Sequence, residues 1–185
     1  VVKVTYPDGS SDTVNVPVTV KDVTGPTIKA DSATVTKNEP ITPIPVTAVD
    51  NTGGVGLRDK NPIEVSNLPQ GLKYENGQIT GTTNAKTGYY TVRITAYDKN
   101  NTPSTKPIRI TVQEQASKYN PTGSTLTVPY NHVITDDEVK AKVKNYGPGI
   151  LTVQSKPSTG TVGNAGNAVV KVTYPDGSSD TVNVP

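Results

Sequence analysis

The stretch that decides the fold is VVKVTYPDGSSDTVNVP, which runs from Val1 to Pro17 and returns letter for letter from Val169 to Pro185. An identical block of this length does not arise by chance, so the chain holds one period of a tandem array and the overlap where the next period begins. The period is far longer than the roughly 20 to 50 residues of a solenoid repeat. Each period therefore has room for one or two whole domains.

The repeated block predicts a β-hairpin. Valines recur at every second position in each arm, which is the pattern of half-buried strands. Between the arms lies Pro7-Asp8-Gly9-Ser10, in which proline presets one φ angle and glycine accepts a positive φ. In the first copy, Val18-Thr19-Val20 continues the pattern and predicts the last strand of the same domain. The second copy stops at Pro185, before that strand.

A Tyr-Pro-Asp-Gly-Ser turn within a valine- and threonine-rich hairpin resembles the Rib (alpha-like) repeat of Gram-positive bacterial surface proteins. Lys118-Tyr119-Asn120-Pro121 resembles the opening of such a domain. The resemblance implies a small β-sandwich on an extracellular, cell-wall-anchored protein. Residues 1–22 are then the hairpin and last strand of a preceding Rib-like unit, and residues 114–185 are a Rib-like domain without its last strand.

Between these two parts, turn residues separate short strands at the spacing of an antiparallel sandwich. The predicted strands are Thr27–Lys29, Ala33–Thr36, Ile44–Val49, Ile63–Ser66, Leu72–Tyr74, Gln78–Thr82, Gly88–Asp98 and Ser104–Val112. In the seventh strand, Tyr90, Val92, Ile94 and Ala96 share one face, which is expected to be core.

Three motifs in this part carry a second resemblance. They are Leu68-Pro69-Gln70-Gly71-Leu72, Gly77-Gln78-Ile79-Thr80-Gly81-Thr82 and Gly88-Tyr89-Tyr90-Thr91-Val92. Together they resemble the immunoglobulin-like, cadherin-like modules of bacterial surface proteins, and they assign residues 23–113 to one such module. The predicted fold is mainly β: an immunoglobulin-like antiparallel sandwich followed by a small Rib-type β-sandwich with one short helix.

That helix is predicted at Thr135-Asp136-Asp137-Glu138, a capping box in which Thr135 and Glu138 bond to each other's backbone amides. Val139, Val143 and Tyr146 follow on one helical face, and Gly147-Pro148 is expected to end the helix. Upstream of it, Thr125–Val128 predicts another strand.

Composition limits the size of the cores and the classes of partner. Only 32% of residues are hydrophobic, and Phe, Trp, Met and Cys are absent, so small cores of Val, Ile, Leu and Tyr are expected. The net charge is +2 with both signs interspersed, which gives no support for a nucleic-acid partner. No apolar run in this stretch approaches the length of a membrane span.

The candidate site residues all have a structural interpretation beside the functional one. His132 is the only histidine and is interpreted as a loop residue before the helix. Asp50, Asn51, Asp98 and Asn100 lie at predicted strand ends, where they can be turn residues or calcium ligands. The tighter cadherin sequence Asp-x-Asn-Asp-Asn is absent, so no metal site is assigned.

Two further kinds of site, an isopeptide bond and a tyrosine binding patch, depend on residues that lie close together only in the folded chain. A Lys–Asn isopeptide bond requires a lysine, an asparagine or aspartate and a catalytic acid in one apolar site. Tyr89, Tyr90 and Tyr97 could form a binding patch, although packing in the core and at its rim is the simpler interpretation. The sequence assigns no catalytic residue, no cofactor-binding residue and no cofactor, and it does not indicate an enzyme.

The predicted function is that of a stalk, in which each period adds about 60–70 Å of length and projects a distal adhesive domain. The alternative is a repeat that itself binds a host or neighbouring-cell ligand through many weak copies. Neighbouring tandem repeats are the expected partners. Residues 1–20 could also complete the truncated unit of another chain by strand exchange, or rest on the next domain.

Overall fold

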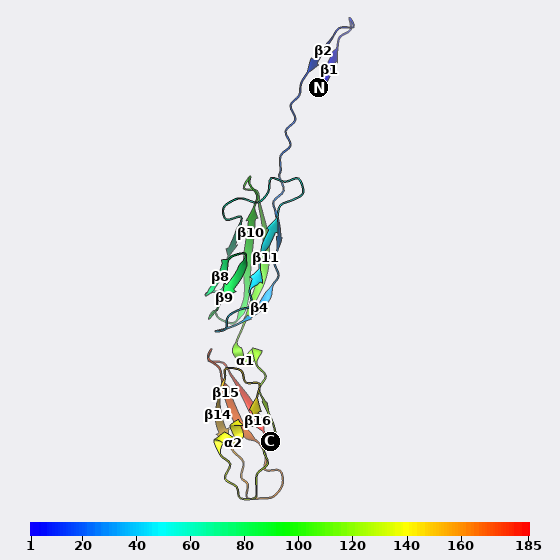
Figure 1. Cartoon of the computed structure of the whole chain (residues 1–185). Helices are drawn as coiled ribbons and strands as arrows, with labels where there is room; N and C mark the ends of the chain where they lie inside the picture. The colour runs from blue at the N-terminus through cyan, green and yellow to red at the C-terminus, as the bar shows by residue number, and fades with distance from the viewer.

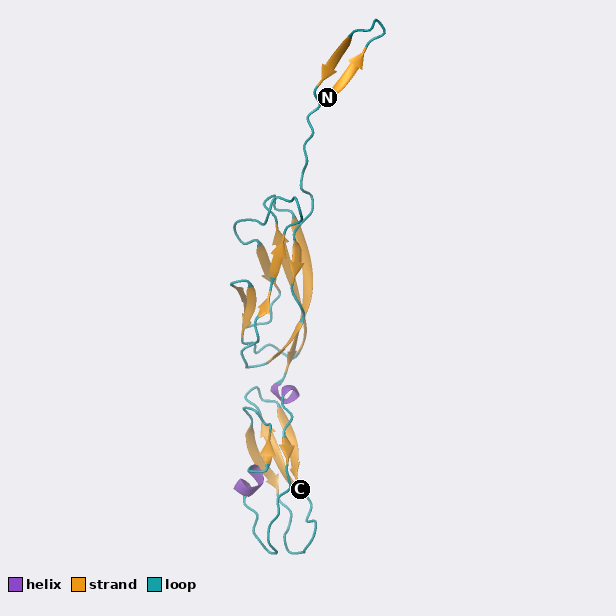
Figure 2. Cartoon of the chain, turned by 45° about the vertical axis from the view of Figure 1, so that its right-hand side comes forward, coloured by secondary structure: helices purple, strands orange, loops and turns teal.

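The structure, a computed structural model that describes all residues 1–185, is elongated. Figure 1 shows a hairpin, an extended segment, a β-sandwich and a smaller β-domain one after another along the chain. Strands dominate both domains, and the two short helices lie in the lower part of the molecule (Figure 2). The mainly β, immunoglobulin-like prediction is confirmed.

The hairpin consists of β1 (Val2–Thr5) and β2 (Ser11–Val14), paired antiparallel. Gly9 has a φ of 86°, as the turn prediction requires. Every residue from 1 to 21 is exposed, and Val18–Val20 belongs to no strand. The first copy of the repeated block therefore forms its local structure without a core beneath it.

The sandwich is built from nine strands. They are β3 (Thr27–Lys29), β4 (Ala33–Thr36), β5 (Ile44–Pro45), β6 (Thr47–Val49), β7 (Ile63–Ser66), β8 (Leu72–Glu75), β9 (Gln78–Gly81), β10 (Gly88–Tyr97) and β11 (Pro103–Gln113). One sheet has the order β4-β11-β10-β7, and it faces two smaller sheets, the pair β3-β6 and the three-stranded sheet β5-β9-β8. All pairings are antiparallel except β4 with β11, which is parallel.

The predicted strand Ile44–Val49 is divided in two, because β5 pairs with β9 whereas β6 pairs with β3. The chain changes partners at Val46, whose amide bonds to the carbonyl of Gly77.

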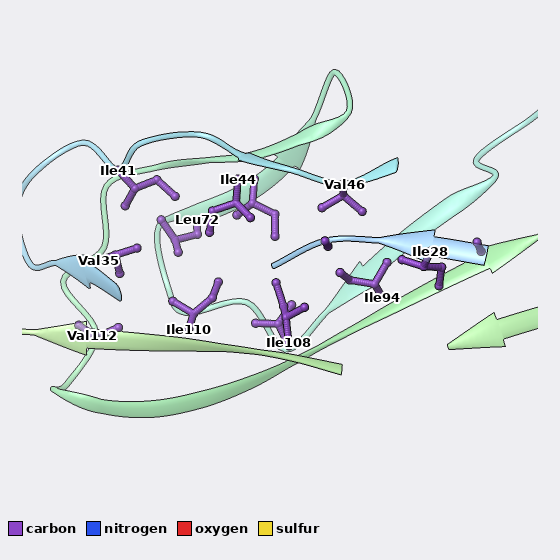
Figure 3. Close-up of a cluster of buried hydrophobic side chains, with 14 residues drawn as sticks. Ile28, Val35, Ile41, Ile44, Val46, Leu72, Ile94, Ile108, Ile110 and Val112 are labelled. Carbon is purple, nitrogen blue, oxygen red and sulfur yellow. The ribbon is translucent and has the colours of Figure 1, made fainter. Parts of the chain in front are cut away.

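Fourteen buried side chains fill the space between the sheets, most of them Ile and Val (Figure 3). Val92, Ile94 and Ala96 are wholly buried, which confirms the predicted core face of β10. Gly71, Gly77 and Gly81 all have positive φ angles, and Gly71 and Gly81 approach each other's strands so closely that a Cβ would collide with backbone oxygen atoms. These two glycines are therefore required for the strand pairing, not only for the turn.

The smaller domain holds the remaining seven elements. They are α1 (Gln115–Lys118), β12 (Thr122–Gly123), α2 (Asp136–Lys140), β13 (Val143–Lys144), β14 (Ile150–Ser155), β15 (Ala168–Thr173) and β16 (Ser179–Val184). Strands β14, β15 and β16 form a sheet, and β12 pairs with β13. Nine buried residues form its core, among them Val170, Val172 and Tyr174 from the second copy of the repeated block.

Three local predictions are corrected here. The capping box at Thr135 is present, but α2 ends at Lys140 rather than near Gly147, because Val143 and Lys144 pair with β12. A second helix, α1, forms at the start of the Rib-like domain, for which only one short helix was predicted. Thr125–Val128 is not a strand, since a single backbone hydrogen bond, from the Leu126 amide to the Pro185 carbonyl, joins it to the neighbouring segment.

Candidate functional site

The most connected polar site of the chain is the joint between the sandwich and the smaller domain. Glu39, in the turn after β4, accepts hydrogen bonds from the side chains of Gln115, Lys118 and Tyr119. These three residues lie in or directly after α1, which follows β11 with a single residue between. One carboxylate of the sandwich therefore fixes the start of the next domain.

The turn of the second hairpin closes the joint from the other side. The Gln115 amide donates to Asp176 Oδ2 at 2.7 Å, and the Asp176 amide donates to Gln115 Oε1 at 2.9 Å. The Ala116 amide donates to Ser178 Oγ at 3.0 Å. Gln115 is 1% exposed, so its side chain is buried while bonded to both domains. The Pro-Asp-Gly-Ser turn thus serves as a docking element as well as a hairpin turn.

Electrostatics and packing reinforce these contacts. Burial works to raise the pKa of Glu39, but hydrogen bonds from Lys118, Tyr119 and Gln115 outweigh it and lower the pKa from its usual value. The hydrogen bond to Glu39 raises the pKa of Lys118, so the pair is charged at neutral pH. The rings of Tyr119 and Tyr174 stack with centroids 5.6 Å apart. The two domains are therefore held together by charge and hydrogen bonds, and the ring stacking fixes Tyr119 within the smaller domain.

The joint residues were not singled out from the sequence. Glu39 and Gln115 lie 76 residues apart, and no local pattern connects them. One signal was available: the first copy of the turn repeats Asp8 and Ser10 at the positions of Asp176 and Ser178. In the first copy, the amide and the hydroxyl of Ser10 donate to Asp8 Oδ1.

His132 has a structural role. Its Nε2 atom lies 2.9 and 3.0 Å from the two carboxylate oxygens of Glu138, the capping-box residue of α2. The backbone amide of Thr135 and the His132 ring lower the pKa of Glu138. No third ionisable ligand lies near this pair, so the contact stabilises the start of α2.

The predicted strand-end residues gather at the far end of the sandwich. Asp98 Oδ1 accepts from the amides of Asn100 and Thr102, both at 2.8 Å, which confirms its turn role. Asp50 Oδ2 accepts from the Gly56 amide at 2.7 Å, and Asn51 lies beside it. The carboxylates of Asp50 and Asp98 also meet that of Asp22, which the sequence did not indicate as part of this group.

The three tyrosines do not form one patch. Tyr89 is 72% exposed with Arg109 over its ring, and Tyr97 lies under Arg58 at 4.0 Å. Tyr90 points to the other face of β10, packs against the core and donates to the Lys86 carbonyl. The isopeptide arrangement is also not assembled, since no lysine or asparagine is among the buried residues.

A groove of about 400 Å³ opens at the end of the smaller domain. Its apolar lining includes Leu126, Val128, Ile134, Ala168 and Val184. At its edge the Leu126 amide donates to the Pro185 carbonyl at 2.7 Å, the first bond of a ladder that goes no further. The groove therefore has room for a further segment beside Leu126.

Two small β-domains joined end to end define a class of modular β-repeat. The Rib domain family model matches residues 1–22 and 115–185, and the model described as "Putative Ig domain" matches residues 26–113. The two Rib segments together make up half of the chain, so this chain belongs to the Rib domain family. The family prediction drawn from the hairpin and the sandwich motifs is confirmed.

One similar protein is the C protein alpha-antigen of Streptococcus agalactiae, which is 30% identical over 191 residues. The match covers 99% of this chain and 18% of that protein, so the chain spans less than a fifth of its length.

Among solved structures, the EC22-24 fragment of mouse cadherin-23 matches with a TM-score of 0.37 and 16% identity, over 86% of this chain and 65% of that one. The human desmocollin-1 ectodomain matches with a TM-score of 0.36 and 14% identity, over 97% and 45%. At these scores the likeness is loose, and the sandwich is defined by its own sheets. Neither helix of this chain is long and apolar enough to cross a membrane.

Proposed function

We propose that this chain is a structural repeat of a cell-wall-anchored bacterial surface protein, with no enzymatic role. Immunoglobulin-like and Rib-like modules alternate in an extracellular stalk that projects an adhesive domain from the cell. The observation that carries the proposal is the joint, where Glu39 and Asp176 bind the two sides of α1. A joint with this many directional contacts resists bending, as a spacer must.

Small-angle scattering of one, two and three linked periods tests this function. The maximum dimension is expected to grow by about 60–70 Å with each added period, because two domains of this size in line span that length. Glu39→Gln removes the charge that three donors share and is expected to broaden the distance distribution. Glu75→Gln, an equal change on an exposed strand, is the matched control. A compact profile, or a dimension that does not grow with copy number, contradicts the stalk.

Neighbouring repeats are the proposed partners, and the groove at Pro185 supports this. The identical block is followed in its first copy by Val18-Thr19-Val20, whose valines are 84% and 92% exposed. In an array the corresponding residues of the next period follow Pro185 and reach the groove directly. In a separate chain of this length, the groove accepts Val18–Val20 of a second copy by strand exchange.

Sedimentation measures this exchange. The average mass is expected to rise above that of a monomer as the protein concentration increases into the high micromolar range. The double variant Val18→Ser with Val20→Ser keeps the hairpin but loses the apolar segment, and it is expected to stay monomeric. A monomer at every concentration for the unchanged chain rules out exchange.

A further inference from the structure

Three carboxylates converge where the extended segment enters the sandwich, at the end nearer the hairpin in Figure 1. Asp22 comes from the segment, Asp50 directly follows β6, and Asp98 directly follows β10. One oxygen of each carboxylate lies within 4.8 Å of those of the other two. Residues from three distant parts of the chain therefore present oxygen atoms to one point.

Asp98 gives the independent sign that something occupies this point. Its side chain is wholly buried, and Oδ1 already accepts two backbone amides in the turn. Oδ2 is also buried and has no hydrogen-bond partner. A buried carboxylate oxygen without a partner is strongly unfavourable, and native structures rarely keep one without an ion or water beside it. The turn role of Asp98 accounts for only half of its carboxylate.

The charges of the other two carboxylates are not balanced by basic residues. Asp50 accepts from the Gly56 amide at 2.7 Å, and Asp22 accepts from the Val55 and Thr24 amides at 3.3 and 3.1 Å, so these donors are neutral. None of the five ion pairs of the chain involves any of the three aspartates. Three like charges at this spacing repel one another unless a cation lies between them.

Two further oxygen groups border the cluster. The Asn51 side-chain amide lies 3.1 Å from the Thr24 carbonyl oxygen and 2.9 Å from Asp50 Oδ1. Both neighbours are acceptors, so the amide either donates to both or turns its own oxygen toward a shared cation. The three carboxylates supply the oxygen ligands that hard cations require, and the cluster contains no imidazole nitrogen or sulfur ligand for zinc.

We propose that Asp22, Asp50 and Asp98 bind a calcium ion that fixes the extended segment to the immunoglobulin-like module. Calcium binds oxygen at about 2.3–2.6 Å in flexible geometry, so its opposite ligands lie about 5 Å apart. Ligand oxygens that all lie within 4.8 Å of one another are compatible with this distance. Magnesium demands strict octahedra at about 2.0–2.1 Å and usually keeps several waters, so it is less suited to a site built from three protein carboxylates.

Calorimetric melting in chelator and in about 5 mM calcium tests the site. Calcium is expected to raise the melting temperature of the sandwich by about 5 °C, since it binds only the folded state. Asp22→Asn and Asp50→Asn are isosteric and are expected to lose most of this rise. In chelator, Asp22→Asn is expected to melt no lower than the unchanged chain, because it relieves repulsion. Asp59→Asn, an exposed residue of the same module, is the control and keeps the rise.

A second measurement reads the segment itself. Endoproteinase Lys-C cleaves after Lys21, which is exposed next to Asp22, and calcium is expected to slow this cleavage at least threefold in the unchanged chain but not in Asp50→Asn. The proposal is overturned if calcium changes neither melting nor cleavage. It is also overturned if both aspartate variants keep the full calcium effect, or if magnesium at the same concentration stabilises equally, since that is general charge screening.

Discussion

Extending the chain beyond Pro185 by Val-Thr-Val-Lys-Asp, the residues that follow Pro17, is expected to raise the melting temperature of the Rib-like domain by about 10 °C. The added valines enter the groove lined by Leu126 and Val128. The added backbone continues the ladder that begins with the Leu126 amide and the Pro185 carbonyl. Val18 and Val20, the corresponding residues after the first copy, are almost fully exposed, so the same valines gain their whole burial when they enter the groove.

The size of the effect follows from opposing terms. Burying each valine contributes about 1.5–3 kcal/mol, and each new strand hydrogen bond contributes about 1 kcal/mol. Ordering three residues costs about 1–2 kcal/mol per residue. The net gain is about 2 kcal/mol, and each kcal/mol shifts the melting temperature of a domain of this size by about 4–8 °C.

Scanning calorimetry measures the gain, since the two domains have separate cores. An extension with Ser-Thr-Ser in place of Val-Thr-Val is the control, and it is expected to give little change. The transition of the immunoglobulin-like module is expected to stay where it is. If the valine and serine extensions melt together, the groove is not the position of the missing strand.

The two copies of the repeated block show which properties sequence predicts and which it does not: local structure is predicted, and burial is not. Both copies form the same hairpin, with Gly9 and Gly177 each at a φ of 86°, because turn chemistry and strand alternation are local. Burial is not local: Val172 is wholly buried and Val4 is 37% exposed, although their neighbours in the block are identical. Sequence pattern therefore predicted the hairpin, and only the surrounding domain determines whether it has a core.

The same distinction explains the misassigned elements. The predicted helix forms for about one turn around Val139. Val143 instead lies in a strand, because β12, some twenty residues upstream, pairs with its backbone. The strand predicted at Thr125–Val128 lacks such a partner in this chain. Helix propensity and strand pattern are weak compared with the pairing that tertiary structure provides.

The candidate sites were predictable only in part for a related reason. Asp50 and Asp98 were found because strand ends next to turns are visible in sequence. Asp22 was not, since nothing local shows that the extended segment folds back against those turns. The joint at Glu39 likewise needs contacts across most of the sandwich. Turn chemistry identified single residues of these sites, whereas only the fold shows that residues far apart in sequence lie together.

The repeated block also provides a mutational experiment with an internal control. Val172→Ala is expected to destabilise the Rib-like domain by about 2–3 kcal/mol, because it removes two methyl groups from a fully packed position. Val4→Ala, the same change in identical sequence, is expected to cost less than about 0.5 kcal/mol, because the side chain has no core to leave. Denaturant unfolding followed by circular dichroism measures both.

A cost for Val4→Ala close to that of Val172→Ala would mean that the first hairpin is packed against a partner in solution. Measuring both variants at low and high protein concentration then shows whether that partner is another chain, because only a contact between chains depends on concentration. At low concentration, Val4→Ala is expected to leave the free energy of unfolding almost unchanged. When residues 115–168 of another period are added in front of Val1, Val4 is expected to become as sensitive as Val172, because the added domain then supplies its core.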